Sequence, residues 1–315
     1  MCCFFKLIDK PEVMLKEKWT KTNIPDLTGK VIIVTGGNSG LGFESVKAFA
    51  QNGAEVVLTS RTREKGKAAR NKIGDVNGKI DVMLLDLKKF CSIEQFARDF
   101  KQKYIRLDVL MNNAGIMMTP FFKTKDGLEG QMGVNHFGHY KLTAHLLDMI
   151  VNTPGSRVVN VSSNAHKHGK MDFDDLQFEN NSYSPIKAYS RSKLANLLFT
   201  YELQRFFEAK DAESKAVAAH PGTSRTNLAR YIDDKFWFKL ILPFFWIFTQ
   251  DQEKGALPQI RAAVDENVKG GEYFGPHRGS KGYPVIVDSN EASKNQNDAK
   301  KLWEISENIT GMKLI

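Results

Sequence analysis

Two residues four positions apart, Tyr189 and Lys193, have the chemistry needed for proton transfer. On a helix, this spacing places the phenol and the ammonium on one face. A nearby cation stabilises the phenolate and lowers the pKa of the tyrosine toward working pH, as a general acid/base requires. Because Tyr-x-x-x-Lys is common in structural helices, its meaning depends on the motifs around it.

A serine pair, Ser162 and Ser163, ends the apolar run that precedes this segment. A serine hydroxyl at that position can hydrogen-bond a substrate oxygen and stabilise the charge that develops on it. Together with the tyrosine and lysine, the pair predicts chemistry at a carbonyl or alcohol oxygen.

A glycine-rich segment, residues 35–42, follows the first apolar run and opens a helical segment. Glycines there permit a tight turn and let the backbone approach a pyrophosphate, which the helix N-terminus also favours. We therefore predict cofactor contacts from Gly36, Asn38, Ser39, Gly40, Leu41 and Gly42.

The end of the second apolar run indicates which dinucleotide binds. It carries Ser60 and Arg61, whereas an acidic residue there would hydrogen-bond the ribose 2′-hydroxyl of NAD. A hydroxyl and a guanidinium suit a 2′-phosphate, which favours NADP(H) over NAD(H). The alternative is that Arg61 and Arg63 are solvated loop charges.

Two later strand ends complete the predicted cofactor site. Asp86 and Leu87 end the third run, where a carboxylate can accept from the adenine amine. Asn113, Ala114 and Gly115 end the fourth, where small side chains let the backbone pass close to the ribose. Open α/β sheets bind ligands at the carboxyl ends of their strands, so these positions support one another.

The elements that carry these residues alternate between short apolar runs and helical periodicity. This alternation predicts one doubly wound, mostly parallel seven-stranded sheet with helices on both faces. The predicted strands are Lys30–Thr35, Ala54–Thr59, Lys79–Leu85, Leu107–Met111, Arg157–Val161, Ser214–Ala219 and Glu272–Gly275. The predicted helices include Leu41–Gln51, Ile93–Tyr104, Glu129–Ile150, Ala188–Phe207, Gln252–Val264 and Ala292–Ile309.

The ordered set of motifs resembles the short-chain dehydrogenase/reductase family. It comprises TGGNSGLG at 35–42, NNAG at 112–115, Asn135, VSS at 161–163, YSRSK at 189–193 and HPG at 220–222. Within the family, the stretches at 173–176, 192–199 and 273–276 look most like the retinol dehydrogenase branch, which includes the WW-domain oxidoreductases. The resemblance implies a Rossmann-type fold and an oxidoreductase that uses NAD(P).

The resemblance also implies residue roles. Tyr189 would be the general acid/base, Lys193 would lower its pKa and hold the nicotinamide ribose, and Ser163 would orient the carbonyl. A long segment between the serines and the tyrosine leaves Ser162 as an alternative. Asn135 would support Lys193 through a water. Contacts to the nicotinamide amide would come from Pro221, Gly222 and Thr223 or Thr226.

The resemblance predicts no metal, although three histidines could suggest one. His166 and His168 are expected in a solvated loop, and His220 belongs to the HPG motif.

We expect the chain to divide into a lead-in (1–27), an oxidoreductase domain (28–290) with a lid at about 223–250, and a helical tail (291–315). The aromatic run Phe236–Phe248 in the lid is too apolar to be left in water. It could line a pocket for a lipophilic alcohol or carbonyl such as a retinoid, steroid or aldehyde, touch a membrane surface, form a homodimer contact, or simply pack on the sheet.

Composition narrows the class of protein. The net charge of +9 is spread along the chain, which favours a basic solvated surface over a nucleic-acid tail. Three cysteines form no disulfide framework, and the N-terminus is a poor secretory signal. These features predict a cytoplasmic protein or one bound peripherally to an intracellular membrane, with Cys2 and Cys3 as candidate lipidation sites.

The competing functional class is a catalytically silent NADP-binding regulator or scaffold.

Overall fold

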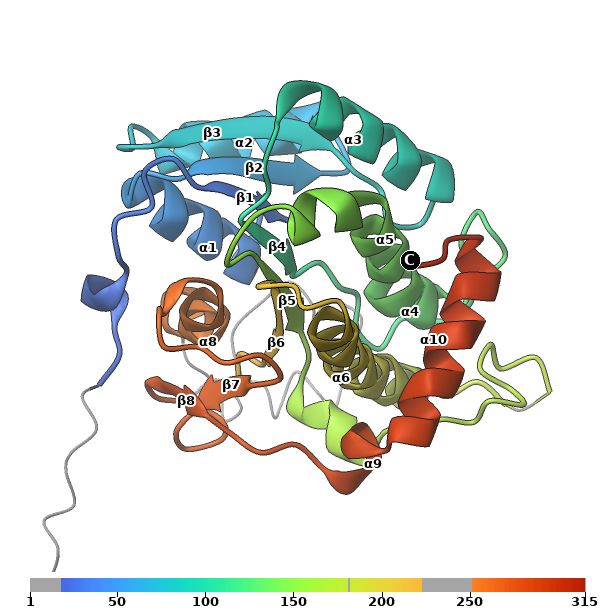
Figure 1. Ribbon diagram of the computed structural model, residues 1–315. Coiled ribbons are helices and arrows are strands. Elements are labelled where there is room, and N and C mark those ends of the chain that lie inside the picture. The colour runs from blue at the N-terminus through green and yellow to red at the C-terminus, as the bar shows by residue number, and fades with distance from the viewer. Residues whose placement is uncertain (1–17, 181, 223–250, 315) are drawn as a thin grey trace, which may run out of the picture.

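The computed structural model describes residues 18–180, 182–222 and 251–314. These residues form one eight-stranded sheet, with the strand order β3-β2-β1-β4-β5-β6-β7-β8, and the helices around it (Figure 1). The predicted lid, the run at 236–248, Thr223, Thr226, Cys2 and Cys3 lie outside these residues. The strands are β1 Val31–Val34, β2 Glu55–Ser60, β3 Lys79–Leu84, β4 Val109–Asn112, β5 Arg157–Val161, β6 Lys215–Ala219, β7 Tyr273–Pro276 and β8 Pro284–Ile286.

The strands from β1 to β7 pair in parallel, as predicted, and confirm the doubly wound fold class. The eighth strand was not predicted and runs antiparallel to β7. The short connection between β7 and β8 allows only a hairpin return, because a parallel partner needs a crossover of a dozen or more residues.

Helices cover both faces of the sheet (Figure 1). Within β1, Ile32 and Val34 join an apolar cluster beneath α1 and α8, while Val31 and Ile33 join a second cluster beneath α3, α5 and α6. Burial on both faces explains why the strand sequences are apolar without alternation. The helices are α1 Gly40–Gln51, α2 Arg63–Ile73, α3 Phe90–Lys103, α4 Gly130–Met132, α5 Gly138–Val151, α6 Pro185–Ala209, α8 Gln252–Val264, α9 Glu291–Lys294 and α10 Gln296–Thr310.

The helix predicted over Glu129–Ile150 is divided into three parts. A π-helical turn, Gly133–Phe137, separates α4 from α5, and the N–H of Gly138 bonds the carbonyl of Gly133. Such a widened turn changes which backbone carbonyls are paired inside the helix, and π-bulges are frequent at functional sites.

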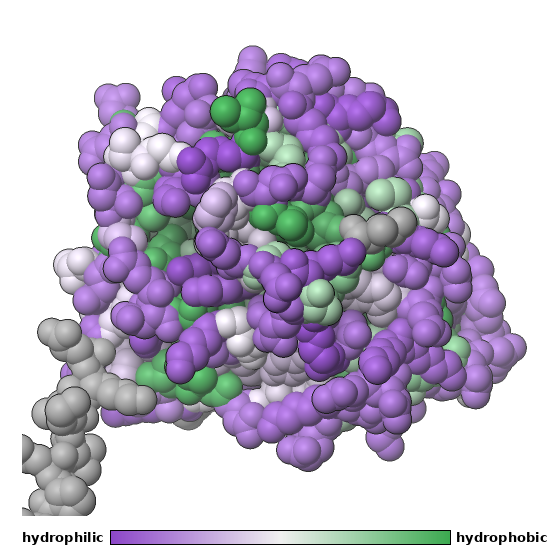
Figure 2. Space-filling view, in the orientation of Figure 1, coloured by the Kyte–Doolittle hydropathy of each residue, from purple (hydrophilic) through white to green (hydrophobic). Residues whose placement is uncertain are grey.

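The C-terminal helix α10 packs against α6 and α5. The Trp303 ring stands edge-on to Tyr140 at 5.7 Å between ring centroids, and Leu302 is buried. The side of the molecule in Figure 2 is mainly hydrophilic, with its hydrophobic residues in small groups. Among the helices of the described ranges, none combines the length and apolar character needed to cross a membrane.

Candidate active site

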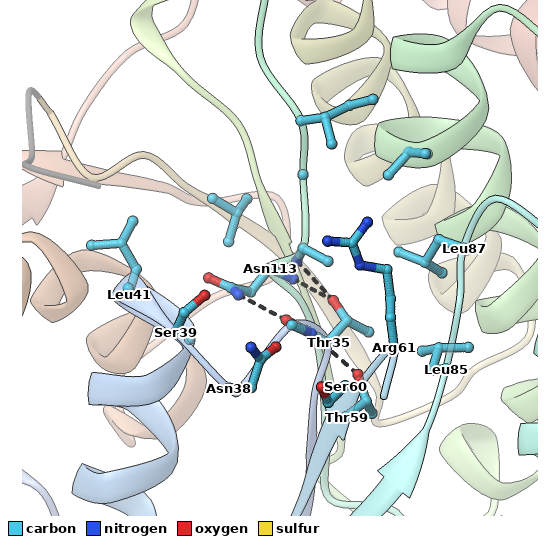
Figure 3. A pocket seen from close by; sticks show the side chains of 18 of the residues that line it. Thr35, Asn38, Ser39, Leu41, Thr59, Ser60, Arg61, Leu85, Leu87 and Asn113 are labelled. Atoms are coloured by element: carbon cyan, nitrogen blue, oxygen red, sulfur yellow. Dashed lines mark hydrogen bonds between the residues drawn. The ribbon is translucent and has the colours of Figure 1, made fainter. Parts of the chain in front are cut away.

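A cavity of about 390 Å³ opens at the carboxyl ends of the central strands (Figure 3). It lies where the strand order reverses between β1 and β4, the usual ligand position in such sheets. Sixteen of the predicted site residues line it: Gly36, Asn38, Ser39, Gly40, Leu41, Gly42, Ser60, Arg61, Asp86, Leu87, Asn113, Ala114, Gly115, Tyr189, Lys193 and Pro221.

Among the described residues, Ser163, Asn135 and Gly222 lie outside this lining. Two lysines that were not predicted do line the cavity. Lys65 lies in the first turn of α2, and Lys88 follows Asp86 by two positions. Their closeness in sequence to Arg61 and Asp86 is the signal that could have identified them.

The glycine loop leaves room for phosphate groups at the start of α1. Gly36 has φ +65°, and a Cβ on Gly42 would come within 2.6 Å of the Gly36 carbonyl oxygen. Ser39 precedes α1 without a side-chain capping bond, so its hydroxyl does not occupy the N–H groups of the first turn. Free N–H groups at a helix N-terminus are the donors that a pyrophosphate needs.

The loops after β1 and β4 are joined through Thr35. Its Oγ1 accepts the N–H groups of Asn113 and Ala114, each at 2.9 Å. The Asn113 amide returns a bond to the Thr35 carbonyl at 2.7 Å (Figure 3). This cross-bonding aligns the glycine loop with the predicted ribose-facing loop.

The end of β2 offers groups that suit a 2′-phosphate. Ser60 Oγ is buried and has no hydrogen-bond partner among the described residues. Arg61 is exposed, and its side chain extends away from the end of β2 along the pocket (Figure 3). Lys65 adds a second positive charge to the same wall. An unpartnered hydroxyl and two cations in the lining of one cavity are a fitting donor set for a phosphate group.

At the third strand end, Asp86 is half-buried. Its Oδ1 accepts the Lys88 N–H at 3.2 Å, which makes a local turn, and its Oδ2 lies 3.9 Å from the Lys89 ammonium. The carboxylate is thus held at the cavity wall.

Tyr189 and Lys193 lie together in α6, both buried. Lys193 Nζ lies 5.7 Å from the centre of the Tyr189 ring and donates to the Val161 carbonyl at 3.0 Å. Burial lowers the pKa of Lys193 to about 8. Burial also raises the pKa of Tyr189 to about 12, against a smaller lowering by its hydrogen bond with Ser163. The pKa of Tyr189 is therefore raised in the chain without cofactor, not lowered as the spacing predicted, because burial of the phenol outweighs its hydrogen bond with Ser163.

The two serines have different partners. Ser162 Oγ donates to the Lys193 carbonyl at 2.8 Å, a bond that joins β5 to α6. Ser163 Oγ accepts the Ala165 N–H at 3.2 Å and hydrogen-bonds Tyr189. Ser163 is thus the serine whose hydrogen bond lowers the pKa of Tyr189, whereas Ser162 is the serine of the pair that lines the cavity.

The expectation of a solvated loop is wrong for His166. Its side chain is fully buried, with Nδ1 2.7 Å from the Ser163 carbonyl and Nε2 accepting the Asn290 N–H at 3.4 Å. A 3₁₀ turn, Asn164–His168, directs this ring inward while His168 stays exposed.

Asn135 lies in the π-helical turn and holds the segment after β4. Its Oδ1 accepts the Ile116 N–H at 2.8 Å, and its Nδ2 donates to the Ile116 carbonyl at 2.9 Å. Gly115 lies close to both Asn135 and Lys193. A Cβ at Gly115 would be 3.3 Å from Asn135 Oδ1 and 3.5 Å from Lys193 Nζ.

Comparisons with known proteins agree with this geometry. A family model described as short chain dehydrogenase matches residues 30–236. Human retinol dehydrogenase 11 is 38% identical over 295 residues, which cover 92% of this chain and 89% of that protein. Human polyprenol dehydrogenase is 36% identical over 298 residues, covering 91% and 87% respectively. A solved structure of an uncharacterised protein from Mycobacterium paratuberculosis is 38% identical, has a TM-score of 0.79, and covers 95% of this chain and 99% of that one.

The family match spans most of the chain, and the relatives align over nearly their whole length. The resemblance expected from the motifs is therefore confirmed. The chain belongs to the short-chain dehydrogenase family, in its retinol dehydrogenase-like branch, and is an oxidoreductase that acts on CH–OH or C=O groups with NAD(P).

Proposed function

We propose that this oxidoreductase prefers NADP(H) and interconverts a lipophilic alcohol and its carbonyl compound. Tyr189, Lys193, Ser163 and Asn135 form its catalytic group. The observation that carries the proposal is that Tyr189 and Lys193 line the same cavity as the glycine loop at 36–42.

In carbonyl reduction, the Tyr189 hydroxyl donates its proton to the substrate oxygen, and the Ser163 hydroxyl hydrogen-bonds that same oxygen. The Lys193 ammonium stabilises the phenolate left behind and would hold the nicotinamide ribose. Asn135 holds the Gly115–Ile116 backbone against Lys193. When bound, the nicotinamide supplies the hydride. The reverse sequence oxidises the alcohol.

The NADP preference is supported by the chemistry at the end of β2. Arg61 and Lys65 would pair with the 2′-phosphate, and Ser60 Oγ would donate to it. The strand ends in Ser60 and Arg61, where a carboxylate would be needed to bind a 2′-hydroxyl. We expect carbonyl reduction as the direction in cells.

The lipophilic substrate is supported by the apolar residues beside the catalytic pair. Ile116, Met117 and Val134 line the cavity near Gly115. Two relatives are named for lipophilic alcohols, retinol and polyprenol. We therefore expect a retinoid, steroid or long-chain aldehyde to be reduced.

Turnover is tested by following NADPH oxidation with retinal, a steroid ketone and medium-chain aldehydes. Tyr189→Phe should lower kcat by about 10²- to 10⁴-fold, the usual contribution of general acid catalysis. Tyr201→Phe is the matched control, because Tyr201 is another α6 tyrosine whose hydroxyl contacts Ser289 outside the cavity lining. Undiminished turnover in Tyr189→Phe would refute the role of Tyr189. NADPH binding without turnover of any carbonyl would favour the silent regulator.

Membrane contact through residues 236–248 and a homodimer are further parts of the proposal. Vesicle flotation of the full chain, with and without aromatic-to-serine changes in that run, tests the first. Sedimentation equilibrium tests the second.

A further inference from the structure

We propose that His139 is a positioning residue that ties the cofactor-binding loop to the catalytic wall of the cavity. The inference rests on the proposed function and concerns a residue to which the site as described gives no role. His139 is the second residue of α5 and is 2% exposed.

The imidazole of His139 bridges two parts of the site. Its Nδ1 lies 3.0 Å from the backbone carbonyl oxygen of Asn135, and its Nε2 lies 2.9 Å from Thr35 Oγ1. Asn135 belongs to the π-helical turn, whereas Thr35 directly follows β1 and starts the glycine loop. The ring therefore connects the catalytic and the cofactor sides across the interior.

The hydrogen bonds of Thr35 determine which nitrogen of His139 carries the proton. Thr35 Oγ1 already accepts N–H bonds from Asn113 and Ala114, which occupy both of its lone pairs. Its hydroxyl must therefore donate, and His139 Nε2 at 2.9 Å is closer than the alternative acceptor, the Met111 carbonyl at 3.3 Å. Nε2 is thus the acceptor, and the proton on Nδ1 is donated to Asn135.

The surroundings of the ring favour the neutral form. Burial, together with the positive charge of Lys193, lowers the pKa of His139 to about 4. A second proton on Nε2 would also face a hydroxyl oxygen with no free lone pair. The neutral Nδ1–H tautomer is the one form that satisfies both neighbours.

The bridge affects both sides of the site. On the catalytic side, the Nδ1–H holds the Asn135 backbone, and the Asn135 amide holds Ile116 beside Gly115 and Lys193. On the cofactor side, Thr35 Oγ1 accepts the N–H groups of Asn113 and Ala114 and so holds the loop after β4. His139 thereby couples the position of the cofactor loop to that of the catalytic lysine.

Two substitutions separate these links. In His139→Asn, the amide nitrogen can replace Nδ1, so the bond to Asn135 is kept and the bond to Thr35 is lost. In His139→Gln, the longer side chain can reach Thr35 in place of Nε2, and the bond to Asn135 is lost. His145→Gln, in the same helix and outside the cavity lining, is the matched control.

We expect His139→Asn to weaken NADPH binding about tenfold, with a smaller change in kcat. We expect His139→Gln to lower kcat about tenfold, with a smaller change in NADPH affinity. Each variant loses one buried hydrogen bond, which sets the size of its effect. NADPH affinity is measured by fluorescence titration, and kcat and KM by steady-state kinetics. Folded variants in which neither quantity differs from that of the control would overturn the proposal.

The tautomer is tested without turnover, by nitrogen-15 NMR of histidine-labelled protein with His139→Asn used for assignment. An Nδ1–H neutral ring at neutral pH supports the proposal, whereas an Nε2–H or charged ring overturns it. If the wild-type chain shows no turnover, the proposed function fails. NADPH affinity and the tautomer then still decide the role of His139 in the cofactor loop.

Discussion

The Lys193 ammonium donates a hydrogen bond to the Val161 carbonyl at 3.0 Å and lies 5.7 Å from the centre of the Tyr189 ring. This bond joins α6 to the end of β5 and places a positive charge beside the phenol without direct contact to its oxygen. The backbone of Gly115 lies close to the same ammonium, since a Cβ there would be 3.5 Å from Lys193 Nζ.

Removing that charge with Lys193→Met should lower kcat by about 10²-fold or more, because the phenolate loses its stabilising cation. Lys215→Met is the matched control, since Lys215 Nζ also donates to a backbone carbonyl, that of Val268 at 2.8 Å, away from the cavity. Steady-state kinetics measure both. Equal losses in the two variants would argue against an electrostatic role for Lys193.

Stability of the cofactor-free chain should depend on pH through Lys193. Its pKa is lowered from 10.5 to about 8, so the unfolded chain binds more protons in this window and the wild type gains stability there as pH rises. Lys193→Met lacks this gain. Urea unfolding of both proteins between these two pH values measures the difference, and parallel pH curves would contradict the burial of the ammonium.

Arg61→Ala should weaken NADPH binding about tenfold or more and leave NADH binding nearly unchanged, because a charge-assisted bond to the 2′-phosphate is lost. Arg63→Ala is the control, a neighbouring arginine that does not line the described cavity. Fluorescence titration with both cofactors gives the affinities. Equal effects of the two substitutions would favour solvated loop charges over a phosphate site.

Substitution of Ser163 should lower activity, whereas substitution of Ser162 should lower stability. Ser163→Ala should lower kcat by about 10²-fold, as for loss of a donor to a developing oxyanion. Ser162→Ala should instead cost about 1 kcal/mol of unfolding free energy, because it removes the bond to the Lys193 carbonyl. Kinetics and urea unfolding of both variants test this assignment, and the opposite pattern would assign catalysis to Ser162.

Trp303→Ala should destabilise the chain by about 3 kcal/mol, because the indole packs against Tyr140, Phe199 and Phe206. Glu304→Ala, at an exposed position of the same helix, is the control and should change stability by less than about 0.5 kcal/mol. Urea unfolding measures both changes. A small effect of Trp303→Ala would mean that α10 contributes little to the core.

Local patterns in the sequence determined the first seven strands, their parallel direction and the strand ends that carry the candidate site. Apolar runs such as Val31–Val34 must be buried on both faces, and Gly36 and Gly42 permit the close turn after β1. The spacing of Tyr189 and Lys193 likewise placed both on one side of α6. These features depend on residues within a few positions of one another in the chain, so they can be predicted from residue order.

The tertiary structure decided which groups meet and which are desolvated. Whether Ser162 or Ser163 contacts Tyr189, and whether His139 and His166 are buried, depends on elements distant in sequence. The raised pKa of Tyr189 has the same origin, because desolvation reflects the packing of the whole cavity wall. Sequence periodicity describes one element at a time, whereas burial and hydrogen-bond partners arise only when separate elements pack together.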